Sequence, residues 1–142
     1  QKVIKNKALK GSQLTLLEDR LVVSLPGSLL FGPNSAILKK TAKDPLFTLG
    51  GLLGNVENQL GINGYADENN FEGTKYKSNW ELSLARSISV GNAFRQAGYS
   101  GELLNFGYGN AHNPYLKNAT DDQRKILSRR IDIVILESGG DK

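Results

Sequence analysis

The sequence predicts an α+β fold, an α/β sandwich in which helices pack on one β-sheet. Strand-like apolar runs alternate with helical segments along the chain, and no internal repeat or low-complexity tract interrupts them. The length of 142 residues suits one domain with an ordinary core. We therefore expect one folded domain over residues 13–138, preceded by a linker over 1–12 and followed by a flexible tail over 139–142.

The first expected element is a β-hairpin or a bent strand. Apolar residues between Leu14 and Leu25 flank a polar tip, Glu18-Asp19-Arg20, which is typical of two strands joined by a turn. Pro26-Gly27 and then Gly32-Pro33-Asn34 punctuate the chain after it.

A helix is expected next, because Pro45 fits the first turn of a helix that runs to about Leu60. Gly50, Gly51 and Gly54 lie inside this segment, and a glycine within a helix costs about 1 kcal/mol relative to alanine. Their expected use is close packing of the helix on the sheet.

The second half of the chain continues the alternation of strands and helices. The expected elements are, in order, a strand from Gly61 to Asp67, a helix from about Asn79 to Ala97 ended by Gly98, a strand near Leu103 to Gly109, a loop through Pro114, a short helix opened by Thr120-Asp121-Asp122, and a strand from Arg130 to Leu136.

The expected helix over 79–97 carries an arginine in an unusual setting. Leu84, Ile88 and Gly91 have the spacing of a core face, and Arg86 points roughly away from them. The stripe that contains the arginine continues as Val90, Ala93 and Ala97. Because this stripe is apolar, we expect a partly enclosed guanidinium that needs a partner, since burying an unpaired charge costs several kcal/mol.

Asp67 is the natural partner of Arg86, directly or through a shared ligand. A carboxylate at the end of a strand and a guanidinium in the following helix can face one site and hold a zwitterion, and arginine binds carboxylate in a bidentate manner. The residues alone leave two alternatives, a plain salt bridge or two solvated side chains. Asn79 is equally well interpreted as an ordinary helix N-cap.

The composition argues against several classes of function. Cysteine is absent, which excludes disulfides, thiolate metal sites and a cysteine nucleophile. His112 is the single histidine, too few for a typical zinc site. No Gly-x-Ser-x-Gly elbow and no paired carboxylates for glycan cleavage stand out, and the glycine-rich segment 50–54 lacks the Lys-Ser/Thr of a phosphate loop. We therefore expect no enzyme, no metal and no cofactor.

The net charge of +4 favours anionic partners only weakly. Basic residues at positions 2, 5, 7 and 10 cluster at the terminus rather than on one structural element, which argues against a nucleic-acid partner. No apolar run approaches the roughly 20 residues that span a bilayer, and the chain starts at Gln1 rather than Met. We expect a processed form or an excised domain whose membrane anchor lies upstream.

Five pieces of sequence, in order and with similar spacing, identify a family. They are Leu25-Pro26-Gly27-Ser28-Leu29-Leu30-Phe31 with Ser35-Ala36, Gly64-Tyr65-Ala66-Asp67, Ser78-Asn79-Trp80-Glu81-Leu82-Ser83 with Arg86, Phe106-Gly107-Tyr108-Gly109 with Pro114, and Ser128-Arg129-Arg130-Ile131-Asp132-Ile133. With these pieces the chain resembles the OmpA-like peptidoglycan-binding domain family from about Arg20 to Leu136. Within that family it is most similar to the carboxyl-terminal domain of MotB-type flagellar stator proteins.

The resemblance implies one mixed sheet with helices on one side, and binding of peptidoglycan without catalysis. Asp67 would take the ammonium, and Arg86 the carboxylate, of the diaminopimelate-type residue of the stem peptide. Asn79 would cap the helix and help to set Arg86, while Arg129 and Arg130 either contact acidic stem groups or only brace the fold. The implied ligand-binding positions are Asp67, Arg86, Asn79, Ala66, Leu82, Arg129 and Arg130.

The resemblance also implies a periplasmic homodimer that anchors a membrane-bound, stator-like assembly and is tethered to the inner membrane. Four positions depart from the family pattern and put affinity and ligand choice in question: Tyr65, Ala66, Gly32 and Ser128. A secretion-linked anchor therefore fits as well as a flagellar one. The alternative function is a protein-interaction or dimerisation domain with weak or no wall binding.

Overall fold

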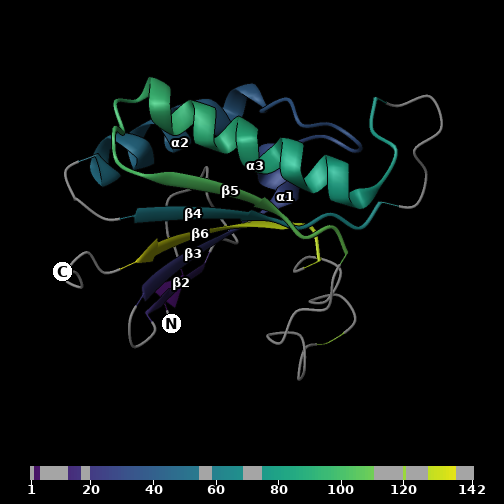
Figure 1. The fold of residues 1–142 in the computed structure, drawn as a ribbon, viewed down its shortest axis with the longest axis horizontal. Coiled ribbons are helices and arrows are strands. Elements are labelled where there is room, and N and C mark those ends of the chain that lie inside the picture. Colours follow the sequence, from purple (N-terminus) through teal and green to yellow (C-terminus); the bar gives the residue numbers. More distant parts are fainter. Residues whose placement is uncertain are drawn as a thin grey trace.

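The computed structural model describes residues 2–3, 13–16, 20–54, 59–68, 75–110, 120 and 128–136. Its elements are β1 (Lys2–Val3), β2 (Gln13–Leu16), β3 (Arg20–Pro26), α1 (Gly27–Leu30), α2 (Lys40–Leu53), β4 (Gln59–Gly64), α3 (Asn79–Gln96), β5 (Leu103–Gly107) and β6 (Arg130–Leu136). The predicted class is confirmed, because one mixed sheet carries the helices on one face (Figure 1). The short helix expected after Thr120 falls outside the described residues.

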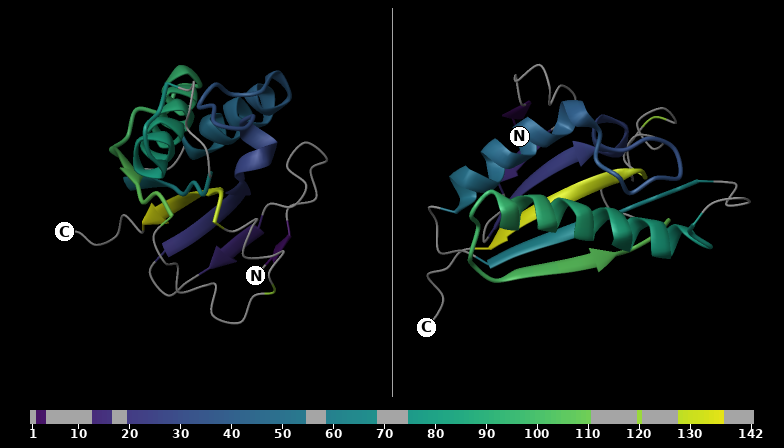
Figure 2. Two further views of the ribbon diagram at one scale, coloured as in Figure 1. Left: turned by 90° about the vertical axis from the view of Figure 1, so that its right-hand side faces the viewer. Right: turned by 90° about the horizontal axis from the view of Figure 1, so that it is seen from above.

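The described strands form one sheet in the order β1-β2-β3-β6-β4-β5. The last strand, β6, lies between β3 and β4 and is antiparallel to both, whereas β4 and β5 are parallel. A parallel pair needs a crossover connection, and α3 provides it on the same face of the sheet as α2 (Figure 2). Because β6 enters the middle of the sheet, residues 128–130 lie next to the ends of β3 and β4.

The expected hairpin is confirmed as β2 and β3, which pair antiparallel with Thr15 opposite Val22. Strand β1 pairs with β2 in turn, with Lys2 opposite Leu14. Two residues of the segment expected to be a linker therefore belong to the sheet.

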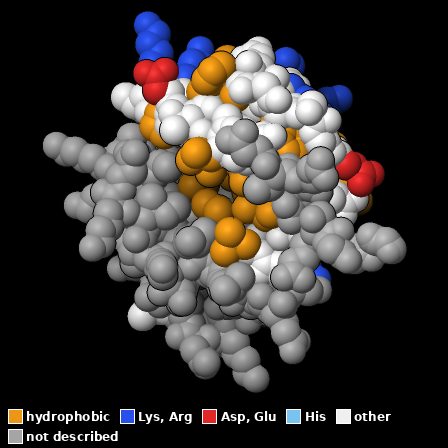
Figure 3. Space-filling model, turned by 90° about the vertical axis from the view of Figure 1, so that its left-hand side faces the viewer, with side chains coloured by type: hydrophobic (Ala, Val, Ile, Leu, Met, Phe, Trp, Pro, Cys, Tyr) orange, Lys and Arg blue, Asp and Glu red, His pale blue; other side chains and the backbone are white. Residues whose placement is uncertain are grey.

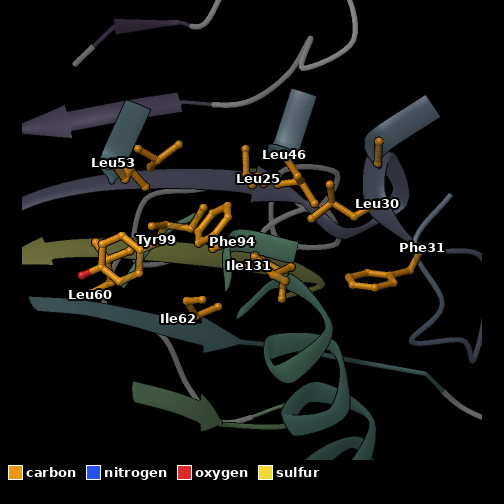
Figure 4. Close-up of a cluster of buried hydrophobic side chains, with 14 residues drawn as sticks. Leu25, Leu30, Phe31, Leu46, Leu53, Leu60, Ile62, Phe94, Tyr99 and Ile131 are labelled. Carbon is orange, nitrogen blue, oxygen red and sulfur yellow. The ribbon is translucent and has the colours of Figure 1, made fainter. Parts of the chain in front are cut away.

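The core lies between the sheet and the helices (Figure 4). Its largest fully buried side chains include Leu25 from β3, Leu46 from α2, Ile62 from β4 and Phe94 from α3. Complete burial of such a side chain stabilises the fold by about 1.5–3 kcal/mol. Hydrophobic side chains also gather on the face at the left-hand end of Figure 1 (Figure 3).

Helix α2 begins earlier and ends earlier than expected. It runs from Lys40 to Leu53, so Pro45 lies inside it rather than in its first turn. A methyl group at Gly50 would lie 3.0 Å from the Cα of Phe94. The predicted close packing at this glycine is therefore against α3 and not against the sheet.

The predicted core face of α3 is wrong at Leu84 and Ile88 and correct at Gly91. Leu84 and Ile88 are exposed, whereas the buried positions of the helix are Leu82, Ser83, Arg86, Ser87, Val90, Gly91 and Phe94. The small residues Ser83 and Ser87 face β4, because near Gly64 the helix comes too close to the strand for larger side chains. A Cβ atom at Gly64 of β4 would lie 2.2 Å from the carbonyl oxygen of Ser83. The buried hydroxyls are hydrogen-bonded, with Ser87 Oγ donating to Ile62 O at 2.7 Å.

Ser78 rather than Asn79 caps α3, since the Ser78 hydroxyl accepts the amide of Glu81 at 3.1 Å. This pairing is the serine half of a capping box. Gly98 ends the helix with a φ of 105°, as expected for a left-handed C-terminal glycine. None of the helices in the described ranges is long and apolar enough to cross a membrane.

We predict that Gly64→Ala lowers the free energy of unfolding by about 1–3 kcal/mol, because its methyl group would overlap the backbone of α3. Urea denaturation measures this loss. Gly51→Ala in α2 is the matched control, since its methyl group meets no atom within 4 Å and replaces a helical glycine. Equal stability of the two variants would contradict the close approach of α3 to β4.

Candidate functional site

Four charged side chains gather where β4 and β5 end and β6 begins, at the right-hand end of the sheet in Figure 1. They are Asp67, Glu68, Arg86 and Arg129, and we call them the charged cluster. Two of them follow β4, one lies in α3, and one immediately precedes β6. Residues distant in sequence thus meet at one end of the sheet.

Arg86 is the buried member of the charged cluster, with only 4% of its surface exposed. Its Nε donates to Ser35 O at 2.8 Å and its Nη2 donates to Gly32 O at 3.1 Å. The guanidinium also lies over the ring of Phe31, 5.2 Å from its centroid. Burial lowers the pKa of Arg86 from its ordinary value, and the negative charge of Glu68 opposes this effect.

The acceptors of Arg86 belong to a tight turn over residues 32–35. The amide of Ser35 donates to Gly32 O at 3.3 Å, and Asn34 has a positive φ of 54°. Proline at the second position and asparagine at the third favour such a turn, because proline presets φ and asparagine tolerates the left-handed region. The sequence Gly32-Pro33-Asn34 therefore builds the carbonyl pair that holds the guanidinium.

Glu68 joins this turn to the rest of the cluster. Its Oε1 accepts the amide of Asn34 at 3.2 Å, and its Oε2 lies 3.4 Å from Nε of Arg129. The amide group of Asn79 holds the Glu68 backbone on both sides, since Oδ1 accepts its N–H at 2.8 Å and Nδ2 donates to its carbonyl at 3.2 Å. Asn79 therefore positions the segment after β4 instead of capping α3.

Asp67 has a less engaged carboxylate than Glu68. Its side chain is partly exposed, and within the described ranges it accepts one hydrogen bond, from Ser128 Oγ at 3.5 Å. Its backbone carbonyl is held by Arg129, whose Nε and Nη2 donate at 3.1 and 2.9 Å. Arg129 thus fixes the place of Asp67 without neutralising its side chain.

The plain salt bridge between Asp67 and Arg86 is not formed. No Asp67 oxygen lies within 4.0 Å of the Arg86 nitrogens among the ion pairs of the described residues. The alternative of two solvated side chains also fails, because Arg86 is buried. The predicted enclosure of the guanidinium is confirmed, but its protein partners are carbonyls.

Arg130 is not part of the charged cluster. Its Nε donates to Asp132 Oδ1 at 2.8 Å, and Ser24 Oγ donates to the same oxygen at 2.7 Å. The guanidinium lies over Tyr65, 4.1 Å from the ring centroid. Side chains alternate along a strand, so Arg130 and Asp132 lie on the face opposite to the core residue Ile131. This arrangement braces β6 against β3.

Two other predicted positions lie beneath the cluster with fully buried side chains, Ala66 and Leu82. The amide of Ala66 donates to Gly109 O at 2.9 Å, which fixes the chain just before Asp67. At Gly32 a Cβ atom would meet nothing within 4 Å, so this departure from the family pattern leaves space beside the cluster.

Glu68 and the turn over 32–35 are functional candidates that the sequence did not reveal. The signal for Glu68 was its position directly after Asp67. The turn was visible as punctuation, but its contact with Arg86 spans 51 residues for Ser35 and 54 for Gly32. His112 lies outside the described residues, and within those residues no group of three or more His, Asp or Glu could hold a metal ion.

A sequence model of the OmpA family matches residues 30–127 of the chain. Among curated proteins of Bacillus subtilis, the chain is similar to protein YtxE, at 31% identity over 95% of the chain, and to Motility protein B, at 25% identity over 98% of it. The matches cover 56% and 54% of those proteins, so the chain spans about half the length of these relatives.

Solved structures share the fold. The periplasmic domain of Helicobacter pylori MotB aligns with a TM-score of 0.81 at 21% identity, covering 97% of this chain and 89% of that one. A MotB-like protein from Desulfovibrio vulgaris aligns at 0.77 and 27% identity, covering 89% and 81%. The cell wall anchor of the T6SS from Pseudomonas aeruginosa aligns at 0.75 and 26% identity, covering 88% and 87%. The predicted resemblance to MotB-type domains is confirmed.

We predict that Arg130→Met lowers the free energy of unfolding by about 3–5 kcal/mol, because it leaves the Asp132 carboxylate buried without its cation. Thermal or urea unfolding measures the loss. The double variant Arg130→Met with Asp132→Leu removes both charges and should recover most of it. A single variant as stable as the wild type would show that the pair does not brace the sheet.

Proposed function

This chain belongs to the OmpA family, and from that premise we propose that it binds peptidoglycan without cleaving it. The ligand group is the diaminopimelate-type residue of the stem peptide, whose free end carries an ammonium and a carboxylate. In this proposal the domain anchors a membrane-bound, stator-like assembly to the cell wall from the periplasm.

The observation that carries the proposal is the incomplete pairing of Arg86. Its guanidinium is buried, yet within the described ranges its Nη1 has no hydrogen-bond partner and no carboxylate lies within 4.0 Å. A buried charge without a counter-ion is unfavourable by several kcal/mol. A ligand carboxylate that accepts from Nη1 would supply the counter-charge and one further charge-assisted hydrogen bond.

Asp67 is suited to bind the ammonium group of the ligand. Its carboxylate is partly exposed and, among the described residues, accepts one long hydrogen bond, from Ser128. Arg129 holds the backbone of Asp67, and Asn79 holds the backbone of the next residue. The backbone from which the carboxylate extends is therefore fixed. An ammonium beside Asp67 and a carboxylate beside Arg86 describe an amino-acid zwitterion.

The named relatives support the anchoring role by analogy. One neighbour is described as the cell wall anchor of the T6SS and others as periplasmic domains of MotB. Because the chain spans about half of its curated relatives, the machine to which it belongs is part of the proposal.

We predict that Asp67→Asn weakens binding of a diaminopimelate-containing stem peptide by roughly tenfold or more. The substitution keeps the shape of the side chain but removes the charge that would face the ammonium, and a hydrogen bond to a charged group contributes about 1.5–3 kcal/mol. Isothermal titration calorimetry measures the affinity, and NMR titration identifies the residues at which the peptide binds.

Glu81→Gln is the matched control for this experiment, because it removes one exposed carboxylate in the first turn of α3. It should bind like the wild type. Unchanged binding in Asp67→Asn would count against the assignment of the ammonium site, and absence of binding by the wild type at millimolar peptide would overturn the proposed function.

A second candidate function, a protein-interaction or dimerisation domain, is favoured by one observation. Trp80, Leu84 and Ile88 lie four residues apart along α3 and are 69%, 37% and 41% exposed. Residues at this spacing share one helix face. An exposed apolar stripe is typical of an interface.

This second candidate predicts that the wild-type chain is a dimer by multi-angle light scattering and that Ile88→Lys returns the mass to 15.5 kDa. A lysine on the stripe would place a charge in the apolar interface, which is unfavourable unless it is paired. Thr41→Lys, on an exposed position of α2 away from this stripe, is the control and should keep the dimer. A wild-type monomer would contradict dimerisation.

A further inference from the structure

We infer that Glu68 is a specificity-determining residue of this site. By pairing with Arg129 it keeps the charged cluster neutral, so that the site selects a zwitterionic ligand end over a purely anionic one. This inference rests on the proposed function and deepens it, since it names the charge state of the ligand that the site accepts.

The first step is the geometry of Glu68. Its side chain is only 12% exposed, and both oxygens are engaged, Oε1 by the amide of Asn34 and Oε2 by the ion pair with Arg129 at 3.4 Å. Its backbone is fixed on both sides by Asn79. A carboxylate held in this way cannot turn to a ligand without breaking its contacts with two segments, the turn at Asn34 and the chain at Arg129.

The second step is the difference in contacts between the two neighbouring carboxylates. Among the described residues, the Asp67 carboxylate accepts a hydrogen bond only from Ser128 Oγ, at 3.5 Å. The Glu68 carboxylate instead forms an ion pair with Arg129. Asp67 is therefore the carboxylate available to a ligand ammonium. Glu68 acts on the ligand through charge and not through contact.

The third step is the sum of charges. The cluster has two guanidinium groups, Arg86 and Arg129, and two carboxylates, Asp67 and Glu68, which gives a net charge of zero. Pairing of Glu68 with Arg129 leaves one cation and one carboxylate for the ligand. This remainder matches a ligand end that carries one carboxylate and one ammonium.

Loss of the Glu68 charge would change this balance. Arg129 would then lie beside the cluster without its counter-charge, and the cluster would carry a net charge of +1. A second guanidinium near Arg86 attracts any carboxylate and disfavours an ammonium. The site would therefore accept an anion more readily and a zwitterion less selectively.

The test compares two ligands with two forms of the protein by calorimetry. One ligand is the stem tripeptide that ends in diaminopimelate, and the other is its analogue in which hydrogen replaces the distal amine. The wild type should prefer the tripeptide. Glu68→Gln should narrow this preference by about three- to tenfold, the size expected for one unit charge acting over several ångströms near a protein surface.

Glu68→Asp and Glu81→Gln are the controls. The first keeps the charge with a shorter side chain, and the second removes an exposed carboxylate elsewhere; both should keep the wild-type preference. An unchanged ratio in Glu68→Gln, with the wild type still binding the tripeptide, overturns this inference and leaves the proposed function standing. A wild type that binds neither ligand overturns the proposed function itself.

A salt series on the wild type decides the matter if Glu68→Gln unfolds below the assay temperature. Selection by charge weakens as ionic strength rises, so the preference should shrink between low and high salt. A preference that stays constant across the series would show selection by shape and would overturn the inference.

Discussion

The burial of one guanidinium organises the functional end of this domain. Arg86 lies against the turn over residues 32–35, and its Nε and Nη2 donate hydrogen bonds to the carbonyls of Ser35 and Gly32. These hydrogen bonds fix the turn against α3, and the amide of Asn34 in that turn then holds Glu68. Because the carbonyls satisfy hydrogen bonds but supply no counter-charge, the fold keeps a buried cation that is stable only beside negative charge.

The position of β6 explains why two consecutive arginines do different work. The strand starts between the ends of β3 and β4, where Gly27 N donates to Arg129 O and Tyr65 N donates to Arg130 O. Alternation along the strand sends the two side chains to opposite faces. Arg130 therefore forms an ion pair with Asp132 on the sheet face opposite to the core, whereas the Arg129 side chain reaches the segment after β4. The start of β6 thus contributes one arginine to the stability of the sheet, and the residue just before the strand contributes another to the charged cluster.

Local signals in the sequence predicted the elements, and long-range packing decided the rest. The bounds of α3 and β6 were predicted well, because Gly98 and the Ser78 region mark helix ends and a β-branched run marks the strand. The buried face of α3 was predicted wrongly at Leu84 and Ile88, since the close approach at Gly64 requires small side chains, Ser83 and Ser87, where the helix meets β4. Asp67 and Arg86 were recognisable by type and spacing. The carbonyl partners of Arg86 and the place of Glu68 depend on contacts over 34 to 54 residues, which periodicity does not encode.

The chain has a net positive charge, whereas the charged cluster is neutral. These two properties are compatible because the net charge acts on a ligand at long range and the cluster acts on it at contact. The net charge of +4 creates a weak field that attracts an anionic polymer from solution, and this attraction is screened over about 8–10 Å at physiological ionic strength. Within the charged cluster, burial of Arg86 and the hydrogen bonds of Asn79 to the Glu68 backbone hold the charged groups in place before a ligand arrives. Groups fixed in advance lose little entropy on binding. Under the proposed function, total charge would therefore govern the approach to the wall, and the four side chains of the charged cluster would select the bound group.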